Sequence, residues 1–204
     1  TPDSRKTFIY NTFEKLMKAI SKSLKKNDPN HLNLGIRYGY IEQLDDELLR
    51  ISKESFDALS FNCYALSPDH EKMNHALEIS GLPMIIGEYH FGTVDRGLAQ
   101  SLWQVNSQKE RGDAFRYYTE NAFAHRGLIG TGWFRWIDQN INGRTDGENY
   151  NCGFIDVTDR PYPYMVDAAI KTAKSLYEIH SGTKTPFHQA PNAVGHSPIP
   201  DLWE

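Results

Sequence analysis

The stretch MIIGEYHFGTVDRG begins as an apolar run and then places a carboxylate, a phenol and an imidazole in succession at Glu88, Tyr89 and His90. A carboxylate at the end of a buried strand can act as a nucleophile when a cation keeps it ionised and a hydroxyl orients it. Side-chain alternation in two earlier strands directs Arg37 and Tyr64 toward this place. A partly buried salt bridge between Glu88 and Arg37 would give the same pattern, and spacing alone leaves both interpretations open.

The elements that must position these residues alternate along the chain. Apolar residues spaced three to four apart predict helices at 7–24, 44–52, 69–79, 108–124 and 164–179. Short runs rich in apolar and aromatic residues predict strands at 32–40, 57–66, 84–88 and 128–137. Strands that alternate with helices form a parallel sheet with right-handed crossovers. The sequence therefore predicts an α/β fold.

Polar and aromatic side chains gather on one face of each predicted strand, toward its C-terminal end. The four sets are Asn33, Gly35 and Arg37; Ser60, Asn62 and Tyr64; Met84, Ile86 and Glu88; Thr131, Trp133 and Arg135. An open sheet covered by helices would be apolar on both faces and would carry a glycine-rich phosphate turn. One-sided polarity is typical of the inward face of a (β/α) barrel of the TIM type, whose eight strands take about 250 residues. About four βα units are expected here.

Five segments of the chain resemble the family-fifty exo-β-agarases, which are retaining glycoside hydrolases of clan A. The segments are DPNHLNLGIRYG, IIGEYHFGTVDRG, KERGDAFRYY, GTGWFRWIDQ and GRTDGENYNCGFIDVTDRPYP. The resemblance covers nearly all of residues 8–180. It implies that the four strands are strands five to eight of the barrel, so that residues 1–180 form the C-terminal half of a (β/α)8 glycosidase barrel and 181–204 an irregular tail.

The resemblance also implies roles for single residues. Glu88 corresponds to the nucleophile at the end of strand seven, Tyr64 to its hydrogen-bond partner, and Trp133 to the strand-eight tryptophan that forms a sugar platform. An indole ring suits the apolar C–H face of a sugar, although core packing is the alternative for each aromatic residue. The further candidates for substrate binding are Arg37, Asn62, Tyr89, His90, Arg135, Asp138, Glu148 and Asn149. For His90, a purely structural role is the alternative.

Two features depart from the family pattern. Arg135 stands where the family's Trp-Phe-Gln pattern has glutamine. The general acid/base of clan A is a glutamate in an Asn-Glu pair after strand four, and no such pair precedes Leu32. Retaining hydrolysis needs two carboxyl groups about 5–5.5 Å apart, and only the first is visible. Asp138, Asp146 and Glu148 are substitutes only in a geometry different from that of the family.

Two functional hypotheses follow. The first is a retaining β-glycoside hydrolase that cleaves β-galactosidic bonds of agarose-type galactans, here as a fragment lacking the acid/base. It would be an enzyme once completed by the missing N-terminal half. The second is a non-catalytic half-barrel that self-associates and at most binds saccharide. In either case the unpaired strand edges need a partner, which is a second copy or the missing half.

Composition narrows the remaining classes of protein to which the chain could belong. The chain has 204 residues, 39% of them hydrophobic, and a net charge of −4, which indicates a globular unit without a basic stripe for nucleic acid. No apolar run approaches the roughly 20 residues of a membrane span. Cys63 and Cys152 are far apart and the eight histidines show no ligand spacing, so neither a structural metal nor a cofactor is expected. The chain begins at Thr1, and the resemblance favours a secreted or periplasmic location.

Overall fold

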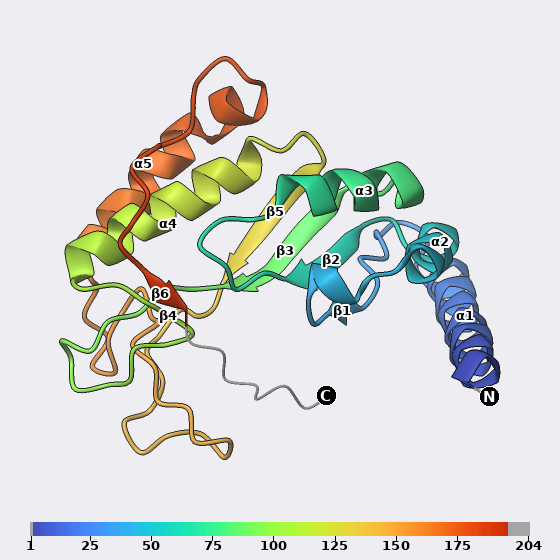
Figure 1. Ribbon diagram of the computed structural model, residues 1–204, viewed down its shortest axis with the longest axis horizontal. Coiled ribbons are helices and arrows are strands. Elements are labelled where there is room, and N and C mark those ends of the chain that lie inside the picture. The colour runs from blue at the N-terminus through green and yellow to red at the C-terminus, as the bar shows by residue number, and fades with distance from the viewer. Residues whose placement is uncertain (1, 196–204) are drawn as a thin grey trace. The chain divides into compact units, whose positions relative to one another are not determined.

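The computed structural model describes residues 2–195 (Figure 1). The chain divides into two compact units. The first unit contains the described residues up to Asn62, together with Asp69–Gly87 and Gly127–Gly130. The second unit contains Cys63–Pro68, Glu88–Arg126 and the described residues from Thr131 onward. Residues 196–204, the end of the predicted irregular tail, lie outside the described residues.

The helices occur where the apolar spacing predicts them. The first unit contains α1 (Pro2–Asn27), the short 3₁₀ helix η1 (Ile41–Gln43), α2 (Asp46–Ser55) and α3 (His70–Ser80). The second unit contains α4 (Gln108–Phe123) and α5 (Pro163–His180), which pack against each other. In the first unit, α2 packs against both α1 and α3. Apart from η1, each helix confirms a predicted one, with ends shifted by a few residues.

Side chains just before three helices explain where those helices begin. Asp45 accepts a hydrogen bond from the backbone N–H of Leu48, and Asp69 and Ser107 act in the same way at α3 and α4. Gly81 ends α3 at a φ of +68°, a conformation that glycine adopts without steric cost. These local signals fix the helix boundaries.

The predicted α/β fold with a parallel sheet is confirmed. Its strands are β1 (Arg37–Tyr38), β2 (Leu59–Asn62), β3 (Met84–Tyr89) and β5 (Leu128–Trp133), in the order β1-β2-β3-β5. β1 runs parallel to β2, with Arg37 opposite Ser60. β1 is shorter than the predicted 32–40 strand. Gly35 interrupts it at a φ of +71°, close against the ring of Phe56.

Two short strands were not predicted from the sequence. β4 (Trp103–Gln104) and β6 (Val194–Gly195) form an antiparallel pair in the second unit (Figure 1). β6 lies within the segment predicted to be an irregular tail. Among the described residues, no helix is both long and apolar enough to cross a membrane.

Candidate active site

Glu88 is the penultimate residue of β3 and is hydrogen-bonded to Tyr64. The Tyr64 hydroxyl lies 2.7 Å from Glu88 Oε2 and donates to it. Burial of the phenol is the main cause that raises the pKa of Tyr64 far above its ordinary value. The hydrogen bond to the Glu88 carboxylate and the charge of that group raise this pKa further. Tyr64 therefore stays protonated and donates to the carboxylate at every physiological pH.

An extra residue in β3 accounts for the direction of Glu88. Leu59 N–H donates to Pro83 O and Cys63 N–H donates to Glu88 O, so four steps along β2 are matched by five along β3. Such a bulge breaks alternation and can redirect a side chain beside a site. Burial follows this break, because Gly87 and Glu88 are both half-buried while Met84 and Ile86 are completely buried.

The predicted grouping of Met84 and Ile86 with Glu88 on the polar face is therefore wrong. In the first unit, a β-carbon on Gly87 would lie 2.3 Å from Arg37 Cδ and 3.3 Å from Asn62 Oδ1. Gly87 thus shares its face with Arg37 and Asn62, whereas Met84 and Ile86 point to the opposite face. The proximity of Arg37 to Glu88 stays a prediction.

His90 is buried, and both of its ring nitrogens have partners in the protein. Nε2 accepts from the backbone N–H of Leu102 at 3.1 Å, so Nδ1 carries the proton that it donates to Phe134 O at 3.0 Å. Burial lowers the pKa of His90 to about 3. The ring packs edge-on against Tyr64 at 4.8 Å between centroids. His90 is thus a neutral residue that supports the phenol bound to Glu88.

Trp133 ends β5 within a cluster of aromatic rings. Its indole Nε1 donates to Cys152 O at 2.6 Å, and Tyr89 meets it edge-on with centroids 5.2 Å apart. Tyr89 itself is buried and stacks on Tyr118 at 4.1 Å. Trp133 is half-buried and retains accessible surface, whereas Tyr89 does not.

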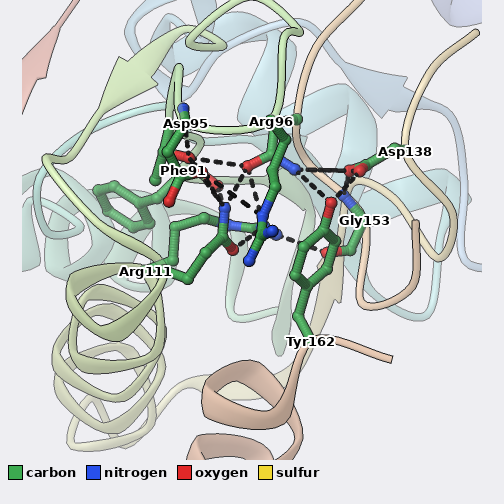
Figure 2. Close-up of polar contacts among 10 residues, drawn as sticks. Phe91, Asp95, Arg96, Arg111, Asp138, Gly153 and Tyr162 are labelled. Carbon is green, nitrogen blue, oxygen red and sulfur yellow. Dashed lines mark hydrogen bonds and ion pairs between the residues drawn. The ribbon is translucent and has the colours of Figure 1, made fainter. Parts of the chain in front are cut away.

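Sequence reasoning missed Arg111, the centre of a buried polar network (Figure 2). From α4, its guanidinium donates to Phe91 O at 3.1 Å, to Gln108 Oε1 at 2.8 Å and to Gly153 O at 2.5 Å. It also lies 4.9 Å from the centre of the Tyr162 ring. The sequence contained a signal for this role, because Arg111 falls on the apolar face of α4. A cation at such a position needs several hydrogen-bond partners inside the protein.

Asp138 belongs to the same network (Figure 2). Its Oδ1 accepts from Gly153 N–H at 2.6 Å and its Oδ2 from the Tyr162 hydroxyl at 2.6 Å, and both oxygens accept from Asn151. The side chain is buried. Asp138 is therefore a buried residue whose hydrogen bonds hold the segment 151–153 in place.

The loop after β5 carries the remaining candidates. Glu148 Oε2 accepts from Gln139 Nε2 at 2.7 Å and lies 3.4 Å from the Arg144 guanidinium. Arg144 also pairs with Asp146. Asn149 is half-buried in the same loop, and Arg135 is half-buried close to the end of β5. The second unit thus brings together Tyr64, Glu88, His90 and the aromatic cluster of Trp133.

A carboxylate at one strand end, a phenol that orients it and a tryptophan ending the next strand form the kind of site found in glycoside hydrolases. No family model matches the chain. β-Agarase A of Vibrio sp. (strain JT0107) is 37% identical over 165 residues, which are 78% of this chain and 16% of that protein. The chain spans about a sixth of the length of the curated relatives it matches.

Solved structures agree with this similarity. An exo-β-agarase matches with a TM-score of 0.80 and 32% identity, covering 87% of this chain and 24% of the other. PfGH50B matches with a TM-score of 0.77 and 36% identity, covering 82% and 24%. The predicted resemblance to the family-fifty exo-β-agarases is confirmed, because most of the chain is similar to a part of these β-agarases.

Proposed function

We propose that the chain is the part of a retaining β-glycoside hydrolase that contains the catalytic nucleophile. This hydrolase cleaves β-galactosidic bonds of agarose-type galactans. The hydrogen bond from Tyr64 to Glu88 at a strand end carries this proposal, and the similarity to β-agarases gives the substrate class. The four parallel strands are strands five to eight of a TIM-type (β/α)8 barrel. Residues 1–180 belong to that barrel and 181–204 form a C-terminal tail.

In this mechanism, Glu88 attacks the anomeric carbon and forms a covalent glycosyl-enzyme, which water then hydrolyses. Tyr64 orients the attacking carboxylate, since its hydroxyl donates to Oε2. A carboxyl group outside these 204 residues acts as the acid/base. We do not assign that role to Asp138, because both of its oxygens accept internal hydrogen bonds, nor to Asp146 or Glu148, which pair with Arg144.

Substrate contacts divide by accessibility. Trp133, Arg135, Glu148 and Asn149 retain accessible surface, and we assign them to sugar binding together with Arg37 and Asn62. Tyr89, His90 and Asp138 are buried and are proposed to support these residues from behind. A secreted or periplasmic location suits a polymeric galactan as substrate.

An activated 2-fluoro-β-galactoside tests Glu88 without needing the acid/base. A dinitrophenolate leaving group departs unprotonated, so attack by Glu88 would leave a fluoroglycosyl ester detectable by mass spectrometry. We expect the label on Glu88 in the native chain and no label in Glu88→Gln, which keeps the shape of the side chain but removes its charge. Labelling at another residue, or in both proteins, would contradict the assignment. Absence of labelling in both would favour the non-catalytic alternative.

The alternative is a non-catalytic half-barrel that self-associates and at most binds saccharide, and an apolar surface on α1 bears on the self-association. Five side chains on α1 are at least 41% exposed: Phe8, Ile9, Leu16, Ile20 and Leu24. An apolar stripe of this size calls for a covering partner, which we propose is a second copy or the complementary half of the barrel. Sedimentation equilibrium tests the first option, and a stable 23.4 kDa monomer would exclude self-association.

A further inference from the structure

The carbonyl of Cys152 holds two residues at the end of β5. Trp133 Nε1 donates to Cys152 O at 2.6 Å, and the backbone N–H of Arg135 donates to the same oxygen at 3.3 Å. Trp133 and Arg135 therefore share one acceptor. Their positions relative to each other are fixed by that oxygen.

The acceptor is itself held on both sides. Before it, the Asn151 side chain donates to both oxygens of Asp138. After it, Gly153 N–H donates to Asp138 Oδ1 at 2.6 Å, and Gly153 O accepts from Arg111. Since Cys152 is completely buried between these anchors, its carbonyl has little freedom to turn.

Arg135 differs from the other half-buried or buried arginines of the second unit in its partners. Arg111 has its network and Arg116 pairs with Glu120, whereas among residues 2–195 no acid lies within ion-pair distance of Arg135. Two acids that follow Arg135 along the chain have other partners, because Asp138 accepts from Asn151 and Tyr162, and Glu148 pairs with Arg144.

The charge of Arg135 also acts on the buried segment beside it. Burial raises the pKa of the Cys152 thiol to about 12, and Arg135 is among the groups that oppose this rise. The backbone N–H of Arg135, which donates to Cys152 O, places Arg135 at the segment that positions Trp133. A half-buried cation without an anion is most stable when a ligand supplies one.

We propose that Arg135 forms, beside Trp133, a subsite for an anionic substituent on the bound saccharide, either a sulfate ester or a carboxylate. The planar guanidinium can donate two parallel hydrogen bonds to such an oxyanion, whereas a sugar hydroxyl uses only one. This inference rests on the proposed function, because it assumes a sugar ring at Trp133. It adds a preference for charged galactans to that site.

Calorimetric titration of the whole chain tests the subsite with three galactan oligosaccharides of equal length. One is neutral and agarose-derived, one carries a sulfate ester and one carries a uronate. The native chain is expected to bind at least one charged oligosaccharide about tenfold more tightly than the neutral one, less so as salt is raised. In Arg135→Gln this ratio is expected to fall to about one. Arg126→Gln, at an exposed position of the same unit, should keep it.

Each outcome separates the two proposals. Preference for the sulfated or for the uronate ligand supports the subsite and identifies its anion. Equal binding of all three ligands by the native chain overturns the subsite but leaves the saccharide site intact. A preference that persists in Arg135→Gln also overturns it, since the anion would bind elsewhere. If no oligosaccharide binds, the saccharide site itself fails, and the subsite fails with it.

Discussion

The Tyr64 hydroxyl donates to Glu88 Oε2 across 2.7 Å, linking the segment that follows β2 to the end of β3. This bond orients the carboxylate that we propose as the nucleophile. It also identifies the residue whose removal should disturb the reaction without removing the attacking group.

Replacing Tyr64 with phenylalanine removes this hydrogen bond and keeps the ring. Hydrogen bonds to charged groups contribute about 1.5–3 kcal/mol, so labelling by the activated fluoroglycoside should slow roughly 10- to 100-fold. The rate of adduct formation by mass spectrometry measures this. Tyr177→Phe is the matched control, since Tyr177 is 88% exposed, and it should react at the native rate. A native rate in Tyr64→Phe would show that the bond does not assist attack.

His90 should make the fold sensitive to acid. Its pKa is about 3 when folded and about 6.5 when exposed, so between these values the unfolded chain binds the proton and the folded chain does not. The contribution of His90 to stability is therefore complete above pH 6.5 and falls by about 1.4 kcal/mol per pH unit toward pH 3.

Urea unfolding of the native chain and His90→Gln across this pH range checks the prediction. The variant should be less stable at pH 7, and its stability should depend less steeply on pH. An NMR titration that placed the His90 pKa near 6 would contradict the buried, neutral state.

Trp133 should contribute to the binding affinity for saccharide, whereas the neighbouring Trp136 should contribute little. Trp133 is half-buried and fixed by Cys152 O, whereas Trp136 is 68% exposed and stacks on Phe154. Trp133→Ala should weaken binding of an agarose-derived oligosaccharide about tenfold or more, and Trp136→Ala should change it less than twofold. Calorimetry measures the affinities, and circular dichroism verifies folding. Equal losses in both variants would remove Trp133 as the platform.

Gly153 should tolerate no side chain larger than a hydrogen atom. A β-carbon there would lie 2.3 Å from both Asp138 N and Ile155 O, which are backbone atoms that cannot rotate away. Gly153→Ala should therefore destabilise the protein by about 3 kcal/mol or more in urea unfolding. Gly130→Ala, in β5, is the control, because its new carbon would meet only Ile85 at 3.6 Å. A near-native Gly153→Ala would show that this segment is not rigid.

Local patterns in the sequence determined where the helices and strands form. Apolar spacing predicted the five α-helices, since this signal acts within a few residues. Four of the strands and the position of Glu88 at a strand end were predicted in the same way. The pairing of Glu88 with Tyr64 was expected from the family resemblance, and the structure shows the hydrogen bond.

Tertiary structure alone decided the direction and support of the site. Strict alternation groups Glu88 with Met84 and Ile86, and only the pairing of β3 with β2 reveals the extra residue that turns it toward Tyr64. Arg111 forms hydrogen bonds with residues up to 42 positions away, and no local pattern encodes such partners. Sequence fixes what depends on near neighbours along the chain, whereas strand register and buried polar networks depend on contacts that exist only after folding.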